Sequence, residues 1–137
     1  CITGKSMSDS RRLLVVDDQV EITDLIREIA GAEGYDVYTL NQSSQFFDRF
    51  EQIRPDIVCI DIHMPDVDGI EILRWLSNAN ATSRVVILSG GDPLFTKVAE
   101  RIGEAASLDI HTLVKPFSLS DFREILREVS EPVNGTV

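Results

Sequence analysis

The chain has 137 residues, a length that favours one domain with a hydrophobic core that needs no disulfide or metal to hold it. Its formal net charge is −10, and no run of basic residues offers a face for direct nucleic-acid binding. The apolar runs are too short to span a membrane and the first residues lack the apolar stretch of a signal peptide, so we expect a cytoplasmic protein.

The two ends of the chain show no pattern of a folded element. Residues 1–10 are polar and are expected to be a flexible or artificially added leader, and residues 131–137 to be a linker-like tail. The predicted domain therefore covers residues 11–130. Two cysteines are too few for a disulfide framework, and Cys59 is expected to be a reduced, inert core residue because it lies within an apolar run.

Short apolar runs alternate with helical patterns along the domain. The runs predict strands at 13–16, 35–40, 57–61, 85–88 and 110–114. Apolar residues spaced by three and four predict helices around 22–29, 46–53, 70–76, 95–102 and 122–129. Gly31 and Gly34 are expected to end the first helix, and residues 78–83 to form a polar loop.

Five strand–helix units in succession predict an α/β fold with a parallel sheet and helices on both faces. The continuous apolar character of the runs at 13–16, 57–61 and 85–88 indicates central strands, and the other two look peripheral. In the doubly wound order 2-1-3-4-5, the first and third strands are neighbours at the point where the strand order reverses, which is where such folds bind ligands.

Polar residues follow four of the five predicted strands. Asp17 and Asp18 follow the first strand, Asp61 ends the third, Ser89 follows the fourth and Lys115 the fifth. Carboxylates that share a crevice need protons or a cation, and oxygen ligands suit Mg²⁺. With an ammonium and a hydroxyl nearby, the central carboxylate of Asp61 is predicted to be a nucleophile toward a phosphoryl group.

Each of these residues also has a simpler interpretation. The two aspartates at 17 and 18 could cap the following helix, Asp61 and Ser89 could be turn residues, and Lys115 could be solvated. These residues form a site only if all of them meet at one edge of the sheet.

The sequence resembles the receiver domain of two-component response regulators over residues 11–130. The motifs that carry the resemblance are Asp17-Asp18, Asp61-x-x-Met64-Pro65-x-x-Asp68-Gly69, Ser89, and Lys115-Pro116-Phe117. The resemblance implies a flavodoxin-like (CheY-like) fold, a doubly wound five-stranded parallel sheet of order 2-1-3-4-5.

The resemblance also implies a phosphoacceptor and a metal site. Asp61 would accept a phosphoryl group from a histidine kinase or a histidine phosphotransfer protein. Mg²⁺ would be held by Asp17, Asp18, Asp61 and the backbone carbonyl of His63. The domain would then be a signalling module and not an enzyme, with at most self-phosphotransfer and slow self-dephosphorylation.

The resemblance implies a switch built on Ser89, which would bond a phosphoryl oxygen, and on Lys115, which would pair with the phosphoryl group and precede a cis proline. Family members usually carry Tyr or Phe three residues before the lysine, where this chain has Thr112. The usual coupling of Ser89 to a moving aromatic ring is therefore in question. The face from Phe95 to Ile102 and Thr112 is expected to change most on phosphorylation.

Two other functions remain open from sequence. One is a degenerate receiver that acts as an unphosphorylated docking module, and the other is a Mg²⁺-dependent phosphatase or phosphotransferase for small molecules. His63 stands where such a phosphatase would carry a carboxylate, and no insertion forms a substrate cap. The sequence also leaves open an output domain, a downstream protein or a stand-alone receiver, and a monomer or a homodimer. No binding to nucleic acid or membrane is expected.

Overall fold

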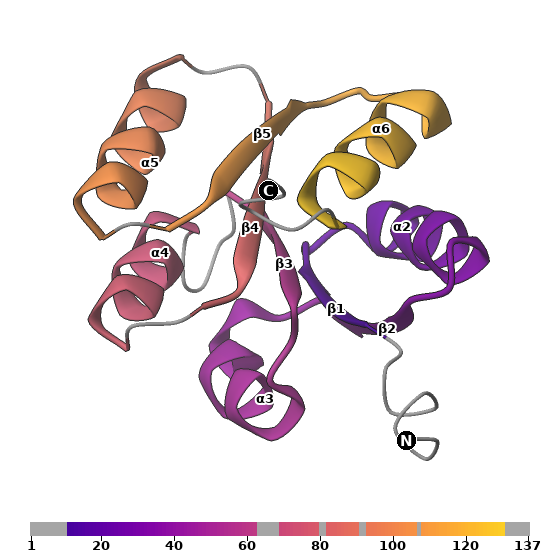
Figure 1. The fold of residues 1–137 in the computed structure, drawn as a ribbon, viewed down its shortest axis with the longest axis horizontal. Helices are drawn as coiled ribbons and strands as arrows, with labels where there is room; N and C mark the ends of the chain where they lie inside the picture. The colour runs from indigo at the N-terminus through magenta and orange to yellow at the C-terminus, as the bar shows by residue number, and fades with distance from the viewer. Residues whose placement is uncertain (1–10, 63–68, 80–81, 91–92, 107, 131–137) are drawn as a thin grey trace, which may run out of the picture.

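The computed structural model describes residues 11–62, 69–79, 82–90, 93–106 and 108–130. The predicted leader and tail lie outside the described residues. Those residues form five strands that alternate with helices (Figure 1). The strands are β1 (Arg12–Val16), β2 (Asp36–Leu40), β3 (Ile57–Asp61), β4 (Arg84–Ser89) and β5 (Ile110–Val114). The helices are α2 (Val20–Ala32), α3 (Phe46–Ile53), α4 (Gly69–Asn78), α5 (Pro93–Ala106) and α6 (Leu119–Ser130), with a short 3-10 helix, η1 (Ser43–Gln45), before α3.

All neighbouring strands are parallel, and their order is β2-β1-β3-β4-β5. The predicted α/β fold and strand order are therefore confirmed, as is the peripheral position of the second and fifth strands. Because the strands are parallel, their carboxyl ends all lie at one edge of the sheet. That edge brings together the residues that follow β1, β3, β4 and β5.

Two hydrophobic cores lie on opposite faces of the sheet. Successive strand residues point to opposite faces, so Leu14 and Val16 join one core while Leu13 and Val15 join the other. The first core contains buried residues of α3, α4 and α5, and the second contains those of α2 and α6. Figure 1 shows the helices divided in this way. Helices on both faces explain why each central strand contains an uninterrupted apolar run.

The first helix does not end where the sequence predicts. The prediction that Gly31 ends it is wrong, because α2 continues to Ala32. The chain turns at Gly34 instead, which has a φ of +97°. This left-handed conformation favours glycine, whereas Gly31 has helical neighbours on both sides and needs no special backbone angle. The 3-10 helix η1 was also not predicted.

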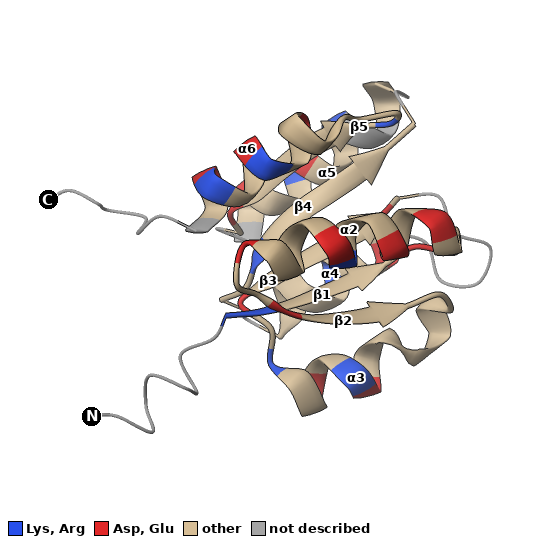
Figure 2. Cartoon of the chain, turned by 90° about the vertical axis from the view of Figure 1, so that its right-hand side faces the viewer, with Lys and Arg blue, Asp and Glu red and all other residues tan. Residues whose placement is uncertain are grey.

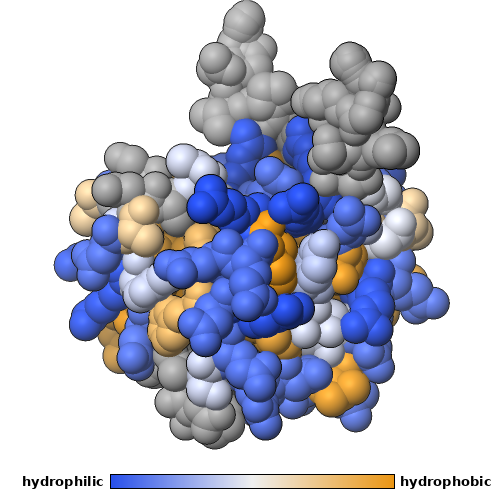
Figure 3. Space-filling view, turned by 90° about the horizontal axis from the view of Figure 1, so that it is seen from below, coloured by the Kyte–Doolittle hydropathy of each residue, from blue (hydrophilic) through white to orange (hydrophobic). Residues whose placement is uncertain are grey.

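Aromatic rings pack between α3 and α4. Trp75 of α4 meets Phe46, Phe47 and Phe50 of α3 at ring-centroid distances of 6.0, 5.2 and 5.5 Å. Phe46 is fully buried and the other three rings are partly buried. Such tilted and edge-on pairs each add about 1 kcal/mol beyond area burial. The view from below is largely hydrophilic, with apolar side chains in separate patches (Figure 3).

Cys59 is fully buried in β3 and is a free thiol. Burial raises the pKa of the Cys59 thiol far above its ordinary value because the charged thiolate would lose its hydration. The predicted inert role of this residue is consistent with that environment, since the thiolate is the reactive form.

Acidic residues are spaced along α2, and α6 carries residues of both signs of charge (Figure 2). Glu21, Asp24 and Glu28 of α2 are exposed. Among the described residues no helix is both long and apolar enough to cross a bilayer.

Candidate functional site at the carboxyl edge of the sheet

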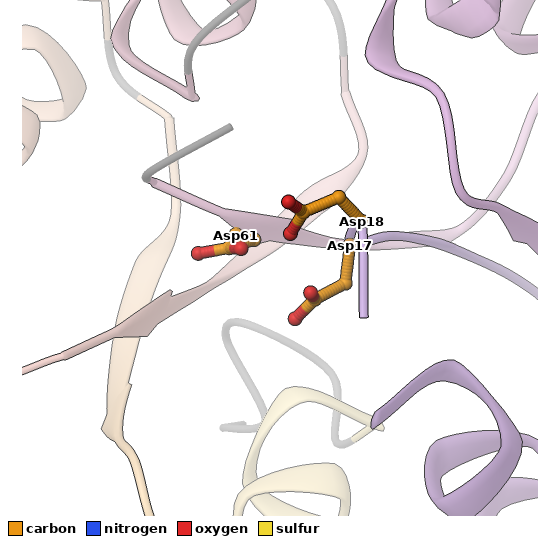
Figure 4. A group of neighbouring side chains, drawn as sticks. All are labelled: Asp17, Asp18 and Asp61. Atoms are coloured by element: carbon orange, nitrogen blue, oxygen red, sulfur yellow. The ribbon is translucent and has the colours of Figure 1, made fainter. Parts of the chain in front are cut away.

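Three carboxylates converge where β1 and β3 end. Asp17 and Asp18 directly follow β1, and Asp61 is the last residue of the neighbouring β3. One carboxylate oxygen from each lies within 4.8 Å of the other two (Figure 4). The adjacency follows from the strand order, since Val16, the last residue of β1, pairs with Ile60 of β3, and Asp17 and Asp61 each come one residue later.

The burial of these carboxylates is uneven. Asp17 is 0% exposed and Asp61 is 5% exposed, whereas Asp18 is exposed. Buried like charges repel each other strongly because little water screens them. The donor set is made only of carboxylate oxygens, which is the chemistry that hard cations such as Mg²⁺ and Ca²⁺ prefer. The three residues therefore fit a divalent cation.

Lys115 supplies a positive charge to the same place. Its Nζ lies 2.8 Å from Asp17 Oδ2 and 3.5 Å from Asp61 Oδ2, and its side chain is only 18% exposed. The Lys115 N–H donates to the Ser89 carbonyl at 2.7 Å, which attaches the chain after β5 to the end of β4. The peptide bond between Lys115 and Pro116 is cis, as the resemblance implies.

Ser89 and Thr112 occupy the adjoining strands. Ser89 is the last residue of β4 and is fully buried, and β4 lies next to β3, where Asp61 pairs with Leu88. Thr112 lies in β5 opposite Ile87 and is partly buried. Because side chains alternate along a strand, Thr112 shares a face with Ile110, which packs against the core of α3, α4 and α5.

One predicted metal ligand, His63, lies outside the described residues, as does the rest of its motif from Met64 to Asp68. The helix that follows this gap begins at Gly69. A Cβ at Gly69 would lie 2.7 Å from Ile62 Cα and 2.9 Å from the Asp61 carbonyl oxygen. The Gly69 N–H also donates to the Ile62 carbonyl at 3.2 Å. A glycine is needed here because α4 begins directly against the end of β3.

Two polar contacts of the site were not foreseen from sequence. The Asn41 side-chain amide donates to the Asp17 carbonyl at 2.9 Å and to Thr23 Oγ1 at 3.1 Å, which connects the end of β2 to β1 and α2. Gln19 accepts a hydrogen bond from Lys115 Nζ through Oε1 at 3.1 Å and donates its backbone N–H to Asp17 Oδ1 at 2.9 Å. The only sequence signal for Gln19 is its place directly after the acidic pair.

The arrangement combines three carboxylates that could hold a cation with the ammonium of Lys115. A family model for the response regulator receiver domain matches residues 13–127 of the chain. This chain belongs to the response regulator receiver family. It is therefore a receiver domain of the kind used in two-component signalling.

Named relatives of this receiver differ in length. It is 31% identical over 120 residues to sporulation initiation phosphotransferase F of Bacillus subtilis (strain 168), an alignment that covers 87% of this chain and 93% of that protein. It is 32% identical over 116 residues to the transcriptional regulatory protein TrcR of Mycobacterium tuberculosis, which covers 85% of this chain but 44% of that protein. The receiver thus spans nearly the whole of one relative and less than half of the other.

Solved receiver structures have the same fold. The chemotaxis protein CheY4 of Vibrio cholerae superposes with a TM-score of 0.75 at 22% identity, over 88% of this chain and 98% of that one. A CheY-like receiver domain protein of Methanospirillum hungatei JF-1 gives a TM-score of 0.76 at 24% identity, over 88% and 93% of the two chains. The flavodoxin-like, CheY-like fold is therefore confirmed.

Proposed function

We propose that this receiver is a phosphorylation-dependent switch whose phosphoacceptor is Asp61. The observation that carries the proposal is a buried carboxylate at a strand end, with two further carboxylates within 4.8 Å and the Lys115 ammonium 3.5 Å away. The acidic neighbours fit a cation and the ammonium fits a phosphoryl oxygen. Without these positive charges, the Asp61 carboxylate would repel an anionic group. With them, it could accept a phosphoryl group.

The transfer requires one bond to form and one to break. An Asp61 carboxylate oxygen attacks the phosphorus of a phosphodonor, the new P–O bond forms, and the electron pair of the breaking bond leaves with the donor. With a phosphohistidine donor, a P–N bond breaks and the imidazole nitrogen takes up a proton. The product is an aspartyl phosphate, so the donor must bring its own phosphoryl group.

The surrounding residues have distinct tasks in this proposal. Asp17, Asp18 and Asp61 would hold Mg²⁺, and the His63 carbonyl is retained as a fourth ligand of the proposal. Bound Mg²⁺ supplies charge neutralisation of the phosphoryl oxygens. Lys115 would neutralise the negative charge of a further phosphoryl oxygen, because its ammonium already lies 3.5 Å from Asp61 Oδ2.

Signalling would follow from the new charge at the strand ends. We infer that the Ser89 hydroxyl donates to a phosphoryl oxygen and that this shifts β4, β5 and α5, including Thr112. Amide hydrogen exchange with and without beryllofluoride should differ most in α5 and around Thr112. Equal exchange in both states would exclude that route for the signal.

The partner of the proposed reaction is a histidine kinase or a histidine phosphotransfer protein. The similarity to a sporulation phosphotransferase over 93% of its length supports this choice. The match to less than half of the transcriptional regulatory protein TrcR leaves a receiver with an output domain open beside a stand-alone one. A docking module that is never phosphorylated is the alternative. It would leave the three carboxylates and the Lys115 ammonium without a chemical role, which is why we favour the switch.

Intact mass spectrometry after incubation with Mg²⁺ and acetyl phosphate tests the proposal. One phosphoryl adduct is expected in the wild type, and none in Asp61→Asn or in EDTA. Asp56→Asn is the matched control, because Asp56 accepts a backbone hydrogen bond at the opposite edge of the sheet and should leave the adduct intact. A folded wild type without any adduct would favour the docking module.

A further inference from the structure

We propose that Gln19 is a positioning residue that keeps the Lys115 ammonium displaced toward Asp17 and so makes room for a cation among the carboxylates. The inference rests on the proposed function and concerns the regulation of that same site. Gln19 lies at the N-cap of α2, and Lys115 follows β5, 96 residues further along the chain. Their contact closes one side of the site.

Three hydrogen bonds form a closed ring at this point. Lys115 Nζ donates to Asp17 Oδ2 at 2.8 Å and to Gln19 Oε1 at 3.1 Å. The Gln19 backbone N–H donates to Asp17 Oδ1 at 2.9 Å. Gln19 therefore holds both partners of the tightest ion pair in the site, with its side chain on the lysine and its backbone on the carboxylate.

The ring places the ammonium off-centre. Lys115 Nζ is 2.8 Å from Asp17 but 3.5 Å from Asp61, the proposed acceptor. An ammonium has three N–H donors, and the Gln19 oxygen satisfies one of them outside the acidic triad. Without this acceptor, the ammonium has only the carboxylates and water to turn to, so it would compete more strongly with a cation for the same oxygens.

A neutral amide is well suited to this task. It accepts a hydrogen bond from the ammonium without adding a fourth negative charge to the three carboxylates. A carboxylate at position 19 would hold the ammonium more strongly and would also attract a cation directly, since charge-assisted hydrogen bonds are stronger than those of a neutral acceptor. The two kinds of substitution should therefore move cation affinity in opposite directions.

Calorimetric titration with Mg²⁺, without any phosphodonor, measures the effect. Gln19→Met keeps the side-chain length and removes the acceptor, and it should weaken Mg²⁺ binding about fivefold, the effect of one modest hydrogen bond. Gln19→Glu should strengthen binding. Gln52→Met is the matched control, because Gln52 Oε1 also accepts a hydrogen bond from a cationic side chain, that of Arg49 at 3.2 Å, but lies in α3. It should bind Mg²⁺ as the wild type does.

A second readout does not depend on the metal. In metal-free protein, exchange of the Lys115 ammonium protons with water, followed by ¹⁵N NMR, should be faster in Gln19→Met than in the wild type and unchanged in Gln52→Met. If the wild type binds no Mg²⁺ but this difference is present, the proposed function fails while Gln19 still positions the lysine. Unchanged exchange, or equal Mg²⁺ affinity in the wild type, Gln19→Met and Gln19→Glu, overturns the inference.

Discussion

The two edges of the sheet differ in how their carboxylates are paired with hydrogen-bond donors and cations. At the amino edge, the Arg12 backbone N–H donates to Asp56 at 2.9 Å, and Arg84 Nε lies 3.6 Å from Asp109. Asp56 and Asp109 thus each have a donor of their own. At the carboxyl edge, three carboxylates lie within 4.8 Å of one another, and Lys115 forms ion pairs with two of them, Asp17 and Asp61. The amino edge is arranged for stability, whereas the carboxyl edge keeps an excess of negative charge that a cation can neutralise.

The largest change in stability is expected when the Lys115 ammonium is removed from the carboxyl edge. Lys115→Met leaves Asp17 buried and unpaired with a cation, so the free energy of unfolding in EDTA should fall by about 3 kcal/mol. Urea denaturation measures it, and saturating Mg²⁺ should restore part of the loss. Lys97→Met on the exposed surface of α5 is the control and should change stability by less than about 0.5 kcal/mol. Equal stability of Lys115→Met and wild type would contradict the prediction.

A backbone contact at the carboxyl edge should be nearly as sensitive. Gly69→Ala places a methyl group 2.7 Å from Ile62 Cα, and backbone cannot move aside cheaply, so stability should fall by about 2 kcal/mol. Gly31→Ala is the matched control. A Cβ there meets nothing within 4 Å, and this helical position should gain about 0.5 kcal/mol because alanine has less freedom to lose.

Thermal unfolding of both glycine variants in the same buffer separates the two effects. If Gly69→Ala were as stable as Gly31→Ala, α4 could not be seated against the end of β3 as described. In that case the position of Asp61 would not depend on this helix.

The smallest expected effect is a change in the free energy of unfolding that should have opposite signs at the two edges of the sheet. In EDTA, Asp61→Asn removes one of three mutually repelling charges and should raise the free energy of unfolding by about 1 kcal/mol. Asp56→Asn at the amino edge weakens the acceptor of the Arg12 N–H and should lower it by about 1 kcal/mol. Chemical denaturation of both variants measures the difference, and a loss of stability in both would mean that the two edges are alike.

Much of the fold could be predicted from sequence because burial patterns are local. Five apolar runs and five helical stripes sufficed to predict a parallel sheet with helices on both faces, whereas the strand order 2-1-3-4-5 was implied by the resemblance to receiver domains. Gly31 was misjudged because a glycine can continue a helix as well as end one, and only the φ of Gly34 distinguishes the turn. Nothing in residues 43–45 marks a 3-10 helix.

The candidate site could be predicted as far as strand ends determine it. Asp17, Asp61 and Lys115 follow apolar runs, so topology alone brings them to one edge. The closer pairing of Lys115 with Asp17 than with Asp61 was not predictable, because it depends on how the loops after β1 and β5 approach each other. The contacts of Gln19 and Asn41 were not predictable for the same reason. No sequence pattern shows in which direction the side chain of an exposed amide next to a strand end points.

Trp75 gives the protein a fluorescence signal that should respond to unfolding but not to cation binding. It is the single tryptophan of the chain, and its ring is enclosed by phenylalanines of α3. It lies six residues along α4 from Gly69, which corresponds to about 9 Å of helix. Its fluorescence should therefore follow unfolding and the separation of α3 from α4, and stay nearly constant while a cation enters the carboxylate cluster. If the Trp75 fluorescence does not change during a titration with a cation, the result reflects the distance of the indole from the carboxylates. It says nothing about the affinity for the cation.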